Sequence, residues 1–300
     1  MSMPTNPKTA SNPSSPYSLM VFSDMDGTFV SDEKTIPSDN LQSLTALYEA
    51  GGCFVPCTGR PTAGLPKLLL EHPCTRYAIC NNGAQILEVH PSATGLHITL
   101  LHEVNLGHER AHKLVDMLES FDVILDIFTD SHAVEAQFDS PHLHEFIPDP
   151  HTLAFAKQLR RSVAVANYHE LVDASDTVAR ISVVFRDPHT AQLLRKLIAQ
   201  DPCLVCVSSA DWNIEISDAS CTKGAALSWL CEHLSQEVDR TVAFGDSFND
   251  VSMLQASGTG IAMANSMGGI ASYATTQLTW TNNEAGVGKC LSQLIERYSR

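Results

Sequence analysis

Short apolar runs alternate with segments of helical periodicity along residues 17–84 of the chain. The apolar runs have the length of strands, and each one ends in polar or turn-forming residues. These runs lie at 19–22, 53–57 and 77–80, and the helical segments between them lie at 38–50 and 62–71. Strand, helix, strand, helix, strand is typical of a parallel sheet with right-handed crossovers. The pattern therefore predicts an α/β unit.

A different pattern occupies the middle of the chain. Alternating segments of strand type are separated by helical stretches, and no internal repeat or low-complexity segment occurs. The expected strands are 96–101, 123–128, 179–185 and 204–208, and the expected helices are 108–120, 150–160 and 190–199. We therefore expect residues 85–212 to form a separate α+β domain inserted into the first unit.

The first pattern resumes after the insertion. A helix is expected at 223–234, strands at 241–244, 260–263 and 277–280, a helix near Gly268, and a last helix ending at Tyr298. The predicted fold class is thus α/β, with a doubly wound, Rossmann-like parallel sheet as the core and an inserted α+β domain. The expected divisions are a disordered tail at 1–16, core segments at 17–84 and 213–300, and the insertion at 85–212.

Two carboxylates, Asp24 and Asp26, directly follow the first apolar run. A buried parallel strand would deliver them to the carboxyl edge of the sheet, where open α/β sheets bind their ligands. Carboxylates this close do not both ionise cheaply, so a cation or a shared proton is implied. A calcium loop of the EF-hand type is excluded because Phe29 and Thr35 stand where Gly and Glu are required. A turn in which the Asp residues only cap the backbone stays open at this point.

Further polar groups follow other strands of the predicted core. They are Thr58, Lys223 at a helix start, and Asp246 with Asn249 and Asp250. In a doubly wound sheet these loops converge on one edge. Carboxylates, a hydroxyl, a lysine and an amide are what phosphoryl transfer requires: oxygen ligands for magnesium, donors for phosphate and a nucleophile held in line. Lys223 alone would be a solvated helix lysine, and only its place in this set gives it meaning.

The ordered set resembles the haloacid dehalogenase-like phosphatases. The long insertion, with Asn82-Gly83-Ala84 before it, looks like the type IIB cap of the Cof-type subfamily. The resemblance covers about residues 19–294 and rests, within the cap, on length and pattern only. Asp24-Met25-Asp26-Gly27-Thr28 matches motif one, Thr58-Gly59-Arg60 motif two, Lys223 motif three, and Gly245-Asp246-Ser247-Phe248-Asn249-Asp250 motif four.

The resemblance implies a role for each motif residue. Asp24 would be the nucleophile that forms an aspartyl-phosphate, and Asp26 would be the general acid and base, for which a raised pKa would be useful. The groups that hold the phosphate would be Met25, Thr58, Gly59, Lys223 and Asn249. Mg²⁺ would be held by Asp24, the backbone carbonyl of Asp26, Asp246, and Asp250 directly or through water.

The function implied is a magnesium-dependent phosphatase acting on a small phosphorylated metabolite, a sugar phosphate or similar phosphomonoester. Two alternatives remain. A phosphomutase of the phosphomannomutase kind shares this cap type, and the motifs do not exclude it. A non-catalytic sensor of phosphorylated ligands is less favoured because every catalytic carboxylate is present. The partner expected is a small-molecule phosphate ester, and nothing in the sequence indicates the oligomeric state.

Composition narrows the setting. The chain has 34 Asp and Glu against 19 Lys and Arg, a formal charge of -15, so nucleic acid is an unfavourable partner. The 9 cysteines fall mostly in apolar runs, which suits buried thiols in a reducing cytosol; zinc at Cys203 and Cys206 is the less favoured interpretation. No apolar run approaches the ~18 residues of a membrane span, and the tail lacks the apolar segment of a signal peptide. We therefore expect a soluble cytoplasmic enzyme.

Overall fold

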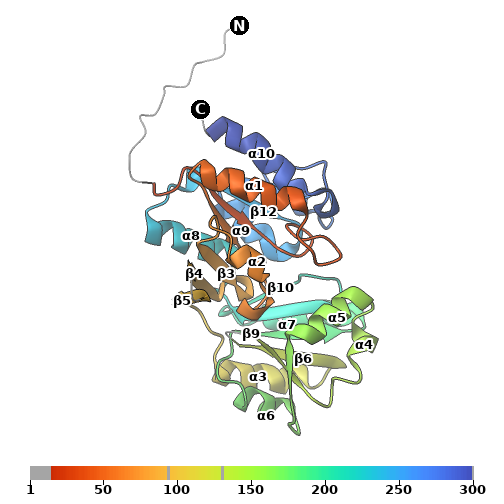
Figure 1. The fold of residues 1–300 in the computed structure, drawn as a ribbon. Helices are drawn as coiled ribbons and strands as arrows, with labels where there is room; N and C mark the ends of the chain where they lie inside the picture. Colours follow the sequence, from red (N-terminus) through yellow and green to blue (C-terminus); the bar gives the residue numbers. More distant parts are fainter. Residues whose placement is uncertain (1–14, 93–94, 130–131, 299–300) are drawn as a thin grey trace.

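The computed structural model describes residues 15–92, 95–129 and 132–298. Figure 1 shows two bodies, a core that includes the red, orange and blue parts of the chain and the cyan helix α8 (Lys223–Leu234), and a cap coloured mostly yellow, green and teal. Residues 1–14 of the expected tail lie outside the described residues. Within the described part, no helix combines the length and apolar character needed to cross a membrane.

The core is built on a parallel sheet whose strand order is β14-β13-β12-β1-β2. This order confirms the predicted doubly wound α/β fold. The strands are β1 (Met20–Ser23), β2 (Cys53–Pro56), β12 (Thr241–Gly245), β13 (Thr259–Ala262) and β14 (Thr276–Gln277). Every residue of β1, β2 and β12 is buried, as expected for parallel strands that are covered on both faces.

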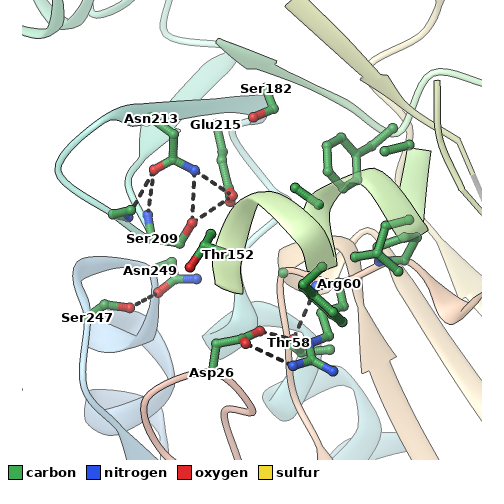
Figure 2. Close-up of a pocket in the computed structure, with 18 of the residues that line it drawn as sticks. Asp26, Thr58, Arg60, Thr152, Ser182, Ser209, Asn213, Glu215, Ser247 and Asn249 are labelled. Carbon is green, nitrogen blue, oxygen red and sulfur yellow. Dashed lines mark hydrogen bonds and ion pairs between the residues drawn. The ribbon is translucent and has the colours of Figure 1, made fainter. Parts of the chain in front are cut away.

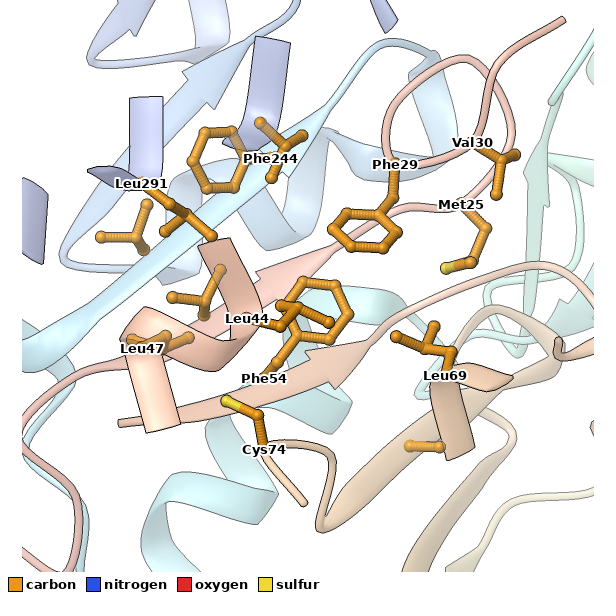
Figure 3. Packing of buried hydrophobic residues seen from close by; sticks show 14 of the residues in the cluster. Met25, Phe29, Val30, Leu44, Leu47, Phe54, Leu69, Cys74, Phe244 and Leu291 are labelled. Carbon is orange, nitrogen blue, oxygen red and sulfur yellow. The ribbon is translucent and has the colours of Figure 1, made fainter. Parts of the chain in front are cut away.

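Alternate side chains of the core strands point to opposite faces, and each face has its own helices. The residues of one face, such as Val21 and Phe54, pack against α1 (Ser38–Glu49) and α10 (Gly286–Tyr298), as Figure 3 shows for part of this cluster. Those of the other face, such as Phe22 and Val55, pack against α8 (Lys223–Leu234) and α9 (Val251–Ala256). The period of two in a strand therefore fixes the sandwich of helix, sheet and helix.

A small antiparallel sheet, β3-β4-β5, extends the core. It consists of β3 (Tyr77–Cys80), β4 (Gln85–Ser92) and β5 (Gly95–Glu103). Side chains of β4 such as Ile86 and Leu87 lie in the hydrophobic clusters of the core. Since residues 85–92 pair with β3 of the core and residues 95–103 pair with residues 85–92, we propose that the insertion starts later than the expected Gln85.

The cap contains a six-stranded sheet in the order β10-β11-β9-β6-β7-β8. Its strands are β6 (Val123–Phe128), β7 (Ala133–Ala136), β8 (Arg160–Val163), β9 (Arg180–Phe185), β10 (Leu204–Val207) and β11 (Asn213–Asp218). One face carries apolar side chains that pack against α3 (His108–Leu118), α6 (Tyr168–Asp173) and α7 (Pro188–Ile198). Because β11 pairs with β9 and β10, the cap sheet runs beyond residue 212. We therefore propose cap boundaries near Val104 and Ala219.

Local chemistry explains where shorter elements differ from the expectation. The helix expected at 62–71 is divided into a 3₁₀ turn (Thr62–Gly64) and α2 (Lys67–Leu70), because Pro66 lacks the N–H that a continuous helix needs. The helix expected near Gly268 is a 3₁₀ turn, Ile270–Tyr273. The remaining cap helices are α4 (Leu143–Phe146) and α5 (Pro150–Leu159); α5 begins where Asp149 accepts a hydrogen bond from the N–H of Thr152.

Candidate active site

The polar loops predicted to converge do so at the carboxyl ends of the central strands. β1 lies between β12 and β2, and its last residue, Ser23, pairs with Phe244 on one side and Pro56 on the other. Asp24, Thr58 and Asp246 follow these three strands closely. The register of the sheet therefore brings motifs one, two and four to one place, and α8, which packs on one face of the sheet, brings Lys223 to the same place.

Lys223 is fully buried and joins two carboxylates. Its Nζ lies 2.7 Å from Asp24 Oδ1 and 2.6 Å from Asp250 Oδ1. Burial raises the pKa of Asp24 to about 7, since the attraction of Lys223 offsets only part of the lost hydration and Asp250 adds repulsion. Burial works against the charged Lys223, but Asp24 and Asp250 hold the pKa of its ammonium above the ordinary value. The site thus gathers more negative charge than one lysine neutralises.

Asp250 uses both of its carboxylate oxygens within the protein. Oδ1 binds Lys223, and Oδ2 accepts hydrogen bonds from the backbone N–H groups of Asp246 and Ser247 at 2.9 and 3.0 Å. These bonds fold the loop that follows β12 into a helix start, with Ser247 as its cap. Asp250 therefore shapes the loop and fixes Lys223.

Oxygens of Asp24, Asp246 and Asp250 lie within 4.8 Å of one another. Thr28 donates its hydroxyl hydrogen to Asp246 Oδ1 at 2.7 Å. Burial raises the pKa of Asp246 well above its ordinary value, and Asp250 and Asp24 raise it further. A Cβ on Gly27 would lie 2.5 Å from Asp246 Oδ2, and the φ of Gly27 is +75°, so only glycine fits here. Clustered carboxylates whose negative charge is only partly neutralised suit a hard divalent cation such as Mg²⁺.

Asp26 lies in the opposite electrostatic environment. Arg60 grips both of its oxygens, with Nε 2.7 Å from Oδ2 and Nη2 2.8 Å from Oδ1, and Lys34 Nζ lies 2.7 Å from Oδ1. Burial alone would raise the pKa of Asp26, but Arg60 and Lys34 hold it well below its usual range. The expected raised pKa beside Asp24 is therefore wrong for this arrangement: two cations outweigh burial and the neighbouring carboxylate.

The other motif residues differ in what they offer to a phosphate. The Met25 side chain is fully buried in the core cluster with Phe29 and Val30, so only its backbone is left for a ligand (Figure 3). Thr58 is buried and accepts the backbone N–H of Arg60 at 3.1 Å. Thr58, Gly59 and Asn249 line one cavity together with Asp24 and Asp26, whereas Lys223, Asp246 and Asp250 lie behind its floor.

This cavity, of about 250 Å³, lies between the core and the cap. Figure 2 shows α5 passing across it, with core residues below and residues of the cap sheet above. The cap contributes the sheet face opposite its apolar one. Part of this face is apolar, where Ile124 and Val184 pack against α4. The rest is polar and yet buried, and it includes Asp126, Arg180, Ser182, Asn213 and Glu215.

The cap also covers the cations that hold Asp26. The ring of Phe155 in α5 lies 4.3 Å from the guanidinium carbon of Arg60. Arg180 donates to the backbone carbonyl of Gly59 at 2.5 Å, so the cap binds the loop of motif two directly. These contacts make the cavity a shared property of both bodies.

A sequence model of the family described as haloacid dehalogenase-like hydrolase matches residues 21–291. The chain belongs to this family. It is 28% identical over 289 residues to phosphatase YwpJ of Bacillus subtilis, covering 91% of this chain and 98% of that protein. It is 26% identical to pyridoxal phosphate phosphatase YbhA of Escherichia coli, covering 81% of this chain and 86% of that one.

Among solved structures, the haloacid dehalogenase subclass IIB sugar phosphatase BT4131 superposes with a TM-score of 0.75 at 19% identity, over 92% of this chain and 98% of that one. This likeness shows the fold, a parallel core with the inserted cap of subclass IIB. The family resemblance inferred from the motifs is confirmed, and the chain is a phosphatase of the haloacid dehalogenase type that acts on small phosphorylated metabolites.

Several residues of this phosphatase site were not singled out from the sequence. These are Lys34, Arg180 and Glu215, whose contacts join distant segments. Arg60 and Asn82 were quoted within motif strings but were given no role, because their contacts with Asp26 and Glu215 also join distant segments. The alternation Asn213-Ile214-Glu215-Ile216 is typical of a half-buried strand and was the available signal for Glu215.

Proposed function

We propose that this chain is a magnesium-dependent phosphatase that hydrolyses a phosphomonoester such as a sugar phosphate through an aspartyl-phosphate at Asp24. The observation that supports this most is the convergence of Asp24, Lys223 and Asp246, of which Asp24 lines the cavity between core and cap and the other two lie directly behind it. A buried carboxylate held by a lysine beside further carboxylates is an arrangement for attack on phosphorus next to a cation.

Asp24 acts as the nucleophile in this proposal. A carboxylate oxygen bonds to phosphorus while the bond to the leaving-group oxygen breaks, and water then attacks the same phosphorus and frees the carboxylate. Lys223 fixes Asp24 by the bond to Oδ1 and balances part of the negative charge that the phosphate brings. Thr58, Gly59, Asn249 and the backbone of Met25 would hold the phosphate oxygens.

Asp26 acts as general base and acid. Its pairing with Arg60 and Lys34 keeps it ionised, which is the form that accepts a proton from the attacking water. In the first step the leaving alkoxide takes a proton from Asp26. Asp26 must therefore be protonated at that point, and its ion pairs with Arg60 and Lys34 must be given up. Arg60 and Lys34 therefore belong to the acid–base machinery.

The cluster of Asp24, Asp246 and Asp250 fits Mg²⁺, because its oxygens are close together and its negative charge is more than the single positive charge of Lys223 can balance. Asp24 and Asp246 would hold the ion, with the backbone carbonyl of Asp26, and Asp250 would hold it through water. When bound, the ion supplies positive charge next to the phosphate.

The test is a screen of phosphorylated metabolites for release of inorganic phosphate, run on the wild type and on Asp24→Asn. We expect the wild type to release phosphate from at least one sugar phosphate without a bisphosphate activator, and Asp24→Asn to release none. Isomerisation without phosphate release would identify a phosphomutase instead. Turnover by verified, pure Asp24→Asn would remove Asp24 as the nucleophile.

A further inference from the structure

Glu215 of the cap reaches into the core. Its Oε2 accepts a hydrogen bond from Asn82 Nδ2, in the loop between β3 and β4. Its Oε1 is held within the cap, 3.0 Å from Arg180 Nη1. It also lies 2.9 Å from Ser209 Oγ and 3.2 Å from Asn213 Nδ2 (Figure 2). The carboxylate is thus fixed by its own sheet and extends one oxygen to the core.

Asn82 passes this contact on to motif four. Its Oδ1 accepts a hydrogen bond from Asn249 Nδ2 at 3.1 Å. Asn82 and Asn249 are both buried, and Asn82 has a left-handed backbone with φ 58°, which Asn tolerates well. At its other end, Asn249 accepts the hydroxyl hydrogen of Ser247 at 2.6 Å. Both amides are therefore held at their two ends.

Glu215 sets the direction of the hydrogen bonds that link it through Asn82 to Asn249. An ionised carboxylate only accepts, so Glu215 makes Asn82 present its NH₂ group to the cap. The carbonyl oxygen of Asn82 then faces Asn249, and an oxygen in that position accepts only an N–H. Asn249 is consequently turned with its NH₂ group toward Asn82 and the cavity, and the second hydrogen of that group is left for a ligand.

We propose that Glu215 is a positioning residue that acts through Asn82 to turn the Asn249 amide so that it donates to the substrate phosphate. The reverse orientation would place the Asn249 oxygen against phosphate oxygens. Since Glu215 belongs to the cap, the phosphate site is correctly oriented only while the cap is closed. This proposal rests on the proposed function, because it takes Asn249 as a phosphate-binding residue.

A simpler role for Glu215 is to balance the buried charge of Arg180, and the variants are chosen to separate the two roles. Glu215→Gln keeps the shape but gives the side chain a donor, so the side chain no longer fixes which way the hydrogen bonds to Asn82 and Asn249 run. Asn82→Gly removes the intermediate amide, suits the left-handed backbone and leaves the pair of Glu215 and Arg180 intact. Ser209→Ala is the matched control, because it removes a partner of Glu215 that is not in the chain to Asn249.

The measurement is the inhibition constant of inorganic phosphate, with magnesium at saturation and an aryl phosphate as substrate. We expect Glu215→Gln and Asn82→Gly each to raise this constant by about tenfold, the usual effect of one hydrogen bond to a charged group, and Ser209→Ala to change it by less than about twofold. Each variant is then combined with Asn249→Ala. In that background neither substitution should raise the constant further, because its effect is transmitted through Asn249.

The outcomes separate the two levels of the proposal. If Asn249→Ala raises the constant but Glu215→Gln and Asn82→Gly do not, or if their effects persist in full without Asn249, the positioning role is wrong and the phosphate site stands. If Asn249→Ala leaves the constant unchanged, Asn249 holds no phosphate, and both its proposed phosphate-binding role and the positioning role of Glu215 are wrong. Should Glu215→Gln not fold, Asn82→Gly alone decides between these outcomes.

Discussion

Asp24 and Asp26 are two residues apart, and their surroundings drive their acidities in opposite directions. Burial raises the pKa of Asp24 to about 7, whereas Arg60 and Lys34 hold that of Asp26 well below its usual range despite burial. Pairs of carboxylates separated in this way commonly divide the work of a hydrolase. Here the separation depends on the fork of Arg60, which is the residue to change first.

Arg60→Gln should raise the pKa of Asp26. The variant loses the larger of the two attractions that offset burial, and Lys34 alone remains. Carbon-13 NMR of the aspartate carboxyls measures this, with the Asp26 signal assigned from Asp26→Asn. Between about pH 4 and 7 the wild-type signal should stay that of a carboxylate, and the variant signal should begin to titrate at the acid end. The exposed Arg161→Gln serves as the control, and identical titration in all three proteins would show that Arg60 does not govern Asp26.

Asp246→Ala should weaken magnesium binding by at least roughly tenfold, since even outer partners of metal ligands cost 10–100-fold when removed. The substitution takes one oxygen donor from the carboxylate cluster and leaves Thr28 without its acceptor. Calorimetric titration of Mg²⁺ into the wild type, the variant and the exposed Asp239→Asn checks this. Equal affinity in all three would place the metal elsewhere.

At the scale of elements, α6 is joined to the cap sheet by a buried acid. Tyr168, the first residue of α6, donates its hydroxyl hydrogen to Asp139 Oδ2 at 2.8 Å and packs edge-on against Phe138. Burial raises the pKa of Asp139 to about 6, and the nearby Asp126 and Glu135 add to it, while Tyr168 offsets part of the rise. The folded cap therefore prefers the protonated acid.

Asp139→Asn should change how stability depends on pH. The folded pKa lies above the unfolded one, so the stabilisation by the neutral acid is complete below about pH 4 and lost as pH rises through about 6. The free energy of unfolding of the wild type should fall, relative to the variant, by on the order of 2 kcal/mol between those values. Urea unfolding at both pH values measures this difference. A difference that is constant with pH would show that ionisation of Asp139 does not destabilise the folded cap.

The elements that could be predicted from the sequence are those whose own residues indicate that they are buried. β1, β2 and β12 are continuous apolar runs ending in motif residues, so both their type and the convergence of their loops followed from the pattern. β11 was missed because its buried residues include the polar Asn213 and Glu215, whose burial depends on contacts with other segments. The ion pair between Arg60 and Asp26 was missed for a similar reason, since the residues of motif one do not indicate which cations lie next to it in the folded protein.

At the scale of the whole molecule, the cap and the core each have their own hydrophobic cluster, and the catalytic groups belong to the core. The polar contacts between the two bodies include Glu215 with Asn82, Arg180 with the carbonyl of Gly59, and Asn81 with the carbonyl of Thr129. The core should therefore fold without the cap, provided that β4 and β5 stay with it.

Replacing residues 105–218 by a short Gly-Ser linker should leave a folded core that binds Mg²⁺ and slowly hydrolyses p-nitrophenyl phosphate. Its discrimination among phosphate esters should collapse, because the cap wall of the cavity is gone. The matched excision of residues 85–218 removes β4 and β5 and should fail to fold. A core that folds without β4 and β5, or that keeps the substrate ranking of the intact enzyme, would contradict this division of roles.

The polar face of the cap sheet has a bearing on how the enzyme releases its product. Asp126, Arg180, Ser182 and Glu215 are buried, yet each bears a group that water solvates readily. If this face were apolar, separating it from the core would carry the full cost of wetting hydrocarbon, and the cap would adhere to the core. With a charged and hydroxylated face, bonds lost on separation are regained from solvent. Such a lining therefore lowers the cost of separating the two bodies and would make the separated surfaces less prone to bind apolar surfaces of other molecules.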